Sequence, residues 1–185
     1  MSQLKKVNNA AYKTTIVIGA GTIKQMAWYF TNILFFKNTF NVSSGSKVFL
    51  LKLFGARVGT GVVIKPGVNI KYPWKLSIGN YSWIGESAWI DNLSDVSLGE
   101  SVTVSQGALI LTGSHDHTKE SFDFISFPVV LENGVWIGAK AVVYGGVTAG
   151  THSILGINAV AENNLRPYTV YKGNPAVPVL KRTIH

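Results

Sequence analysis

The stretch that decides the fold is IGNYSWIGESAWI, residues 78–90, in which Ile78, Ile84 and Ile90 stand six positions apart. Aliphatic residues with the same spacing occur further along the chain, at Val58, Ile64, Ile70, Leu98, Val104, Ile110, Leu131, Ile137, Val143, Ala149, Leu155 and Ala161. A period of six matches neither the 3.6-residue turn of a helix nor the alternation of a strand. Short repeating units of this kind stack into a solenoid, each burying one aliphatic side chain. The sequence therefore predicts an all-β solenoid.

The irregular steps in this ladder indicate where functional residues gather. Three units of six make one coil of 18 residues if the solenoid is a triangular prism, but the step lengthens to eight after Ile70 and Ile90 and to 21 after Ile110. If each group of three is a whole coil, the long steps fall at one corner, on coils stacked about 4.8 Å apart. The inserted segments that should line this edge are 72–74, 92–94 and 112–130.

The 185 residues are expected to form one solenoid domain with extensions at both ends. We expect an N-terminal extension over 1–55, a solenoid of about five coils over 56–165 with the inserted loop 112–130, and an irregular tail over 166–185. Residues 1–13 are polar and predict a weakly ordered start, and the Ser- and Gly-rich 41–47 predicts a hinge. The Pro-containing tail should cross back over the last coil without adding to it.

The amphipathic helix expected at about 22–37 has an apolar run of 11 residues, from Met26 to Phe36. A membrane span needs about 20, so this helix either caps the solenoid alone or also lies against a membrane surface, with Lys24 and Lys37 at its ends. No secretory signal is visible, and we expect a cytoplasmic protein, with a peripheral position at the inner face of the membrane as the alternative.

The net charge of +8 favours a phosphate-rich cofactor, an anionic polymer or a membrane surface as a partner. Binding to nucleic acid is not expected, because no basic helix or known motif accompanies the charge. The absence of cysteine excludes disulfides and thiol catalysis.

His115 is the candidate catalytic residue, because it lies at the start of the longest insertion and histidine has the pKa that a general base needs near neutral pH. The alternative is a loop histidine bonded to a backbone carbonyl. Asp91 and Asn92 lie past the same corner one coil earlier, and either could orient the imidazole or bind an acceptor molecule. Asp116 and Trp74 complete the predicted acceptor site, in which Trp74 would provide the floor for a sugar.

A zinc site built from His115, His117 and His152 is a weaker alternative. The spacing of these residues matches no closed set of zinc ligands. We therefore expect no metal.

Three motifs accompany the ladder: GSHD at 113–116, VWIGAK at 135–140 and KGNPA at 172–176. Together they resemble the hexapeptide-repeat acyltransferases, and within them the colanic acid O-acetyltransferase group, which is related to the maltose, galactoside and nodulation acetyltransferases. The resemblance implies a left-handed parallel β-helix that acts as a homotrimer. It also implies acetyl-CoA as the donor, held in a groove between neighbouring coils and subunits.

The resemblance assigns roles to individual residues. His115 matches the general base, and Asn92 falls where relatives place a polar residue in the acceptor site. Ala139 and Ile157, 18 residues apart, match positions whose backbone contacts the pantetheine arm of CoA. Relatives often carry a Thr-Lys pair near the CoA phosphates, but 162–163 here is Glu-Asn. The basic residues that could bind these phosphates instead are Lys140, Lys172, Lys181 and Arg182.

The leading hypothesis is an O-acetyltransferase that modifies a sugar of a cell-surface polysaccharide or of its lipid-linked precursor. An N-acyltransferase acting on an amino sugar or small amine shares every motif and stays open. A third alternative is a solenoid scaffold without catalytic activity.

Overall fold

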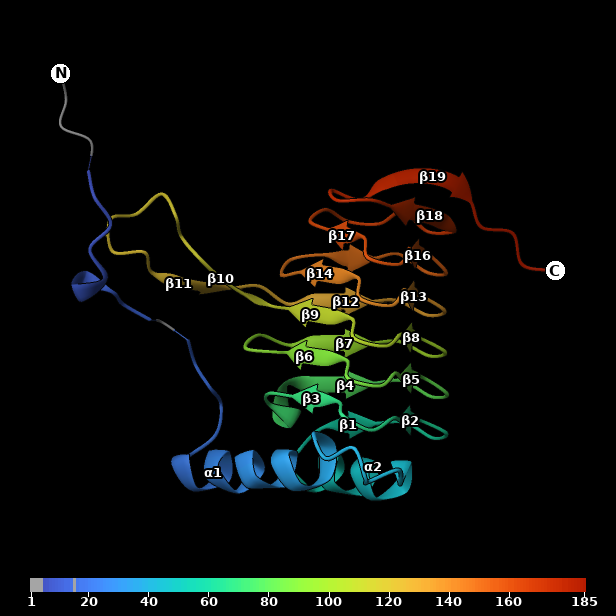
Figure 1. The fold of residues 1–185 in the computed structure, drawn as a ribbon, viewed down its shortest axis with the longest axis horizontal. Coiled ribbons are helices and arrows are strands. Elements are labelled where there is room, and N and C mark those ends of the chain that lie inside the picture. Colours follow the sequence, from blue (N-terminus) through green and yellow to red (C-terminus); the bar gives the residue numbers. More distant parts are fainter. Residues whose placement is uncertain (1–4, 15) are drawn as a thin grey trace.

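The computed structural model describes residues 5–14 and 16–185, and its centre is a β-helix whose three faces are parallel sheets (Figure 1). The first sheet contains β1 (Arg57–Val58), β4 (Leu76–Ile78), β7 (Val96–Leu98), β12 (Val129–Leu131) and β15 (Thr148–Ala149). The second contains β2 (Val63–Ile64), β5 (Trp83–Ile84), β8 (Thr103–Val104), β13 (Trp136–Ile137), β16 (Ile154–Leu155), β18 (Thr169–Lys172) and β19 (Val177–Lys181). The third contains β3 (Asn69–Ile70), β6 (Trp89–Asp91), β9 (Leu109–Leu111), β14 (Val142–Tyr144) and β17 (Val160–Ala161).

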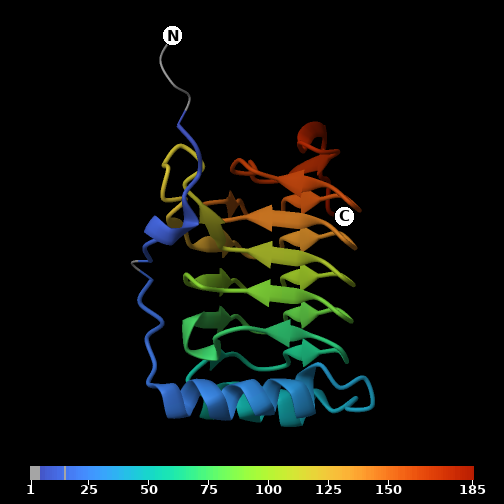
Figure 2. The ribbon, with the colours of Figure 1, turned by 60° about the vertical axis from the view of Figure 1, so that its left-hand side comes forward.

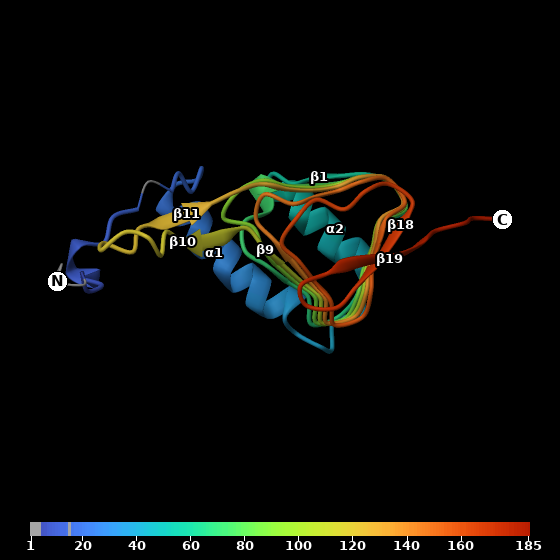
Figure 3. The same cartoon turned by 90° about the horizontal axis from the view of Figure 1, so that it is seen from above.

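The coil is left-handed, as the resemblance implied. Seen from the C-terminal end in Figure 3, the chain passes clockwise from the first sheet to the second and third while it rises toward the viewer. The aliphatic ladder forms the core, since every one of its side chains is buried and most have no exposed surface. Stacking keeps the ladder in register, with Ile78 paired to Leu98 and Ile137 to Leu155. The predicted all-β solenoid is confirmed.

The three irregular steps fall at one corner of the prism, between the third sheet and the first, as predicted. Hydrogen bonds join these insertions from coil to coil. The side chain of Asn92 accepts a hydrogen bond from Tyr72 N at 2.9 Å and donates one to Tyr72 O at 2.6 Å. One coil higher, Thr112 Oγ1 donates to Asp91 O at 2.9 Å. A short 3₁₀ helix, η3 (Pro73–Lys75), fills the lowest of the three insertions.

Two helices cover the N-terminal end of the coil: α1 (Thr22–Thr31), continued by the π-helix η2 (Asn32–Phe36), and α2 (Ser44–Leu53). Trp28 of α1 packs against Phe36 and Phe54 and donates a hydrogen bond to Ile70 O at 2.9 Å. The expected hinge at 41–47 was wrong, because α2 begins inside it. Ser43 acts as the N-cap, its hydroxyl oxygen accepting from Ser46 N.

The long loop leaves the prism as a β-hairpin of β10 (Gly113–His115) and β11 (Phe124–Ser126), and the N-terminal segment lies along it (Figure 2). Asn8 N donates to Glu120 O at 2.8 Å, and Phe124 N donates to Lys13 O at 3.3 Å. This segment includes the 3₁₀ turn η1 (Asn9–Ala11). These contacts give residues 8–13 a defined path along the hairpin, which the expectation of a weakly ordered start did not include; residues 1–4 lie outside the described part of the chain.

The tail also departs from the expectation. β18 pairs in parallel with β16, so the tail adds a strand to the second sheet before β19 turns back antiparallel to β18. The prolines of the tail predicted a segment without a strand in this sheet. None of them, however, lies within the four residues of β18.

Candidate functional site

His115 is the last residue of β10, and its imidazole is held in a fixed orientation. Nδ1 lies 2.9 Å from Phe122 O. A carbonyl oxygen can only accept, so Nδ1 carries the hydrogen and the lone pair of the neutral ring is on Nε2. The ring stacks on Phe122 with centroids 4.4 Å apart and planes 4° from parallel, and it meets Phe124 edge-on. The backbone contact raised as the alternative is thus present, and in the neutral ring it leaves the lone pair on Nε2.

Phe122 supports this arrangement through an uncommon backbone conformation. Its φ is 48°, in the left-handed region that a bulky side chain rarely adopts. The same residue supplies both the carbonyl that accepts from His115 and the ring that stacks on it. Phe122 therefore fixes the imidazole of His115 from two directions, through its carbonyl oxygen and through its ring.

Asp116 lies next to His115 but points into the turn of the hairpin. Its Oδ1 accepts from Thr118 Oγ1 at 2.6 Å and from Thr118 N at 3.1 Å. These hydrogen bonds, the side-chain one first, hold the pKa of Asp116 below its ordinary value. The structure gives this predicted acceptor-binding residue a role in shaping the loop.

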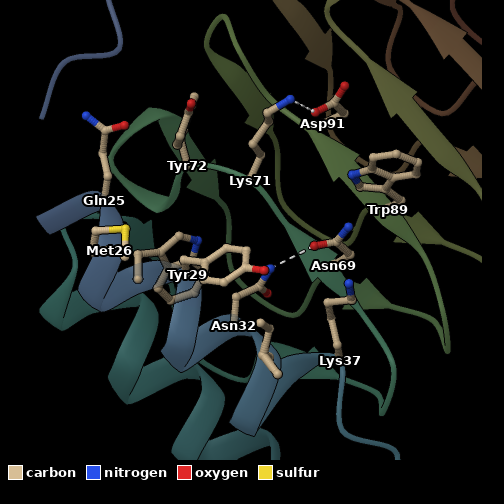
Figure 4. A pocket seen from close by; sticks show the side chains of 12 residues that line it. Gln25, Met26, Tyr29, Asn32, Lys37, Asn69, Lys71, Tyr72, Trp89 and Asp91 are labelled. Atoms are coloured by element: carbon tan, nitrogen blue, oxygen red, sulfur yellow. Dashed lines mark hydrogen bonds and ion pairs between the residues drawn. The ribbon is translucent and has the colours of Figure 1, made fainter. Parts of the chain in front are cut away.

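Asp91 lines a cavity of about 380 Å³ between α1 and the third sheet, which we call the helix cavity (Figure 4). The side chain of Asp91 is only 10% exposed, and Lys71 Nζ lies 2.9 Å from Oδ1. Oδ1 is buried and faces the Lys71 ammonium, so Oδ2 is the oxygen of this carboxylate left to accept a hydrogen bond from a ligand. Tyr29 and Trp89 add aromatic surface to the cavity. Small-molecule sites combine apolar walls with a few polar groups in this way.

Sequence reasoning missed Lys71, Trp89 and Tyr29. A signal for Lys71 was present, because it follows Ile70 as Asp91 follows Ile90 in the next coil. Two residues that directly follow equivalent ladder positions must lie on neighbouring coils. No comparable signal places Tyr29, whose position depends on how α1 packs against the prism.

The other two residues predicted to bind the acceptor, Asn92 and Trp74, make contacts within the described part of the chain. Asn92 has no exposed surface, and its amide group is used by the backbone of Tyr72. Trp74 stacks on Tyr72 at 5.1 Å, donates Nε1–H to Ile18 O at 2.7 Å and has Lys24 Nζ over its ring. These contacts fix the corner and the N-terminal segment, and they leave no open platform on Trp74.

A second concavity of about 450 Å³, the lateral groove, runs along the outer face of the second sheet. Ile157, 75% exposed, and Lys172 both line it. Ala139 lies one coil below Ile157, where Asn158 N donates to Ala139 O at 2.9 Å. Lys140 is exposed at the same corner. The structure therefore brings four of the six predicted cofactor-binding residues to one region.

Lys181 and Arg182 lie elsewhere. Lys181 pairs with Thr169, at the opposite end of β18 from Lys172. The Arg182 guanidinium donates to Gly134 O at 2.9 Å and to His152 O at 3.1 Å, across a different corner. Within one chain these two residues are therefore not part of the lateral groove.

His115 and the lateral groove lie on opposite sides of the prism (Figures 1 and 3). The hairpin projects from the corner between the third and first sheets, whereas the groove faces outward from the second. Over the described part of the chain, no cluster of three or more His, Asp or Glu side chains could hold a metal ion.

Comparisons of the sequence and of the fold with known proteins both find acetyltransferases. The sequence is 35% identical over 164 residues to the protein of Escherichia coli (strain K12) that carries the name colanic acid biosynthesis acetyltransferase WcaF, covering 89% of this chain and 90% of that one. It is 29% identical over 129 residues to the galactoside O-acetyltransferase of the same organism, covering 68% and 64%. The fold matches a hexapeptide-repeat acetyltransferase of Vibrio cholerae solved with acetyl-CoA, with a TM-score of 0.75 and 21% identity over 86% of each chain. No protein-family model matches the sequence.

Proposed function

Because the chain belongs to the hexapeptide-repeat acetyltransferases, and within them to the family of colanic acid biosynthesis acetyltransferases, we propose that it acetylates a hydroxyl group of a saccharide. It is an acetyltransferase, and its acetyl donor is acetyl-CoA. The name of its relative supports a sugar of a cell-surface polysaccharide, or of the lipid-linked precursor, as the acceptor.

The observation that carries the proposal is the orientation of His115. With Nδ1–H donated to Phe122 O, Nε2 is free to take the proton of an acceptor hydroxyl. The hydroxyl oxygen then attacks the thioester carbonyl carbon and forms a C–O bond, which gives a tetrahedral intermediate; its collapse to the ester breaks the C–S bond. The proton passes from Nε2 to the departing sulfur, which leaves as the CoA thiol. A backbone N–H directed at the carbonyl oxygen would stabilise the intermediate.

The donor would bind in the lateral groove, where the exposed Ile157 offers apolar contact and Lys172 positive charge. One chain cannot complete this site, because its own His115 lies across the prism from its own groove. We therefore propose a homotrimer in which the hairpin of one copy lies beside the groove of the next. Light scattering of the purified protein should then give three chain masses, and a single chain mass would contradict the assembly.

The helix cavity is our proposed acceptor site. Replacing Asp91 with asparagine should raise KM for the saccharide by about 10- to 100-fold, because a hydrogen bond to a charged group contributes about 1.5–3 kcal/mol. KM for acetyl-CoA should not change, because none of the residues that line the lateral groove lines the helix cavity. Asp95→Asn is the matched control, since Asp95 lies at the same corner but is exposed. Equal acceptor KM values for both variants would remove Asp91 from the site.

The proposed activity is tested by incubating the full chain with acetyl-CoA and a panel of saccharides that carry hydroxyl groups or amino groups. We expect CoA thiol release that depends on a hydroxyl acceptor, and a product that gains one acetyl mass and loses it in alkaline hydroxylamine. A product stable to hydroxylamine would be an amide and would make the chain an N-acetyltransferase. If no saccharide in the panel increased thiol release, the result would contradict a saccharide as the acceptor.

A further inference from the structure

The outward face of the two N-terminal helices is unusually apolar. Along α1 and its π-helical continuation, Trp28, Asn32 and Phe36 are buried against the prism at four-residue spacing. Ile23 and Phe30 lie seven residues apart on the opposite side of the helix, and they are 88% and 54% exposed. Because the inner face of the helix packs on the coil, Ile23 and Phe30 on the outer face stay exposed.

The second helix repeats the arrangement. Lys47 and Leu51 of α2 have no exposed surface, whereas Phe49 and Leu53, on the opposite side, are 65% and 66% exposed. Both helices lie across the same end of the coil, perpendicular to its axis (Figures 1 and 2). We call the outward surface formed by Ile23, Phe30, Leu34, Phe49 and Leu53 the basal face. Phe40, in the loop between the helices, is 91% exposed and adds to it.

The charge around the basal face has a single sign. Residues 1–85 contain 11 Lys and Arg and no Asp or Glu, whereas residues 86–185 contain 6 Lys and Arg and 9 Asp and Glu. Lys52 on α2 and Lys37, which directly follows η2, are both exposed. Large aromatic and aliphatic side chains beside lysines, with no carboxylate among them, match an anionic lipid surface. Two copies placed base to base would instead bring like charges together.

No helix in the described part of the chain is long and apolar enough to cross a bilayer. A contact with lipid must therefore be an interfacial one. We propose that the basal face docks on an anionic bilayer, with its apolar side chains at the boundary between headgroups and acyl chains and the coil axis standing upright on the membrane. The helix cavity, lined in part by Met26 and Tyr29 of α1, would then open close to the lipid surface.

Flotation of the full chain with vesicles tests the proposal and is independent of catalysis. The protein should float with phosphatidylglycerol vesicles, should float less with phosphatidylcholine vesicles, and should be released as salt is raised. Phe49→Ser combined with Leu53→Ser should lower the partition coefficient about tenfold or more. Val179→Ser combined with Leu180→Ser is the matched control, because both side chains are about half exposed on β19 at the other end of the coil.

Circular dichroism of both double variants keeps the result interpretable, since all four side chains are exposed and the fold should be unchanged. Failure of the wild-type chain to float with phosphatidylglycerol, or equal flotation of the two double variants, would overturn the proposal. A wild-type mass in light scattering that is halved by the Phe49 and Leu53 changes, without flotation, would overturn it in favour of a second copy on the basal face.

Discussion

Replacing His115 with alanine should lower kcat for acetyl transfer by about 100- to 10,000-fold, the usual contribution of a general base. The variant keeps the hairpin backbone and loses the Nε2 lone pair, together with the stacking on Phe122. KM for acetyl-CoA should stay near its wild-type value, because the proposed donor contacts come from the residues that line the lateral groove and not from His115. Initial rates of thiol release at varied acetyl-CoA concentration measure both quantities.

His117→Ala is the matched control, since this exposed histidine lies in the same loop only two residues away. Its kcat should stay within about threefold of the wild-type value. A His115→Ala variant that also keeps kcat within about threefold would remove His115 as the base. A large loss in both variants would instead indicate that the hairpin had lost its structure.

Adding one methyl group at Gly79 should destabilise the fold by about 3 kcal/mol, the upper end of the usual cost of overpacking. A Cβ at this position would lie 2.5 Å from the carbonyl carbon and oxygen of Gly99 and 2.7 Å from Glu100 N. These are backbone atoms of the next coil, which cannot rotate away as a side chain could. The stacking bond from Gly79 N to Leu98 O, 2.8 Å long, would have to stretch.

The midpoint of thermal unfolding should accordingly fall by about 6–12 °C. Gly45→Ala is the control, because a Cβ on this residue of α2 meets nothing within 4 Å. That change should leave the midpoint unchanged or raise it slightly, as alanine is the better helix former. If Gly79→Ala and Gly45→Ala had the same midpoint of thermal unfolding, the result would show that neighbouring coils can separate without cost.

The ladder could be predicted because one aliphatic residue in six leaves few alternative structures. Ile84 and Ile90 have to face inward, and the shared corner then follows from counting the longer steps. The helix beginning at Ser44 could not be recognised in the same way. Ser43 serves as an N-cap and Lys47 is buried, but in the sequence these residues look like a polar hinge. Propensity alone does not reveal such tertiary contacts.

The candidate site was predicted in part for a related reason. His115 was identified from its place in the longest insertion, and its contact with Phe122 depends on a turn conformation that composition does not encode. The amide group of Asn92 bonds to the backbone of Tyr72, a use that the sequence does not distinguish from binding a ligand. Lys71 could have been found by applying the coil count to side chains as well as to the core.

The pairing of the N-terminal segment with the hairpin has a consequence for how the protein matures. This segment leaves the ribosome early, yet Asp123, which accepts a hydrogen bond from Lys13 N, is synthesised 110 residues later. Closing so long a loop costs conformational entropy that local contacts do not offset. The intervening coils bring Lys13 and Asp123 close together, so this contact depends on the coils being folded. The loop that carries His115 is thus held in part by a contact that exists only when the coils between residues 13 and 123 are assembled.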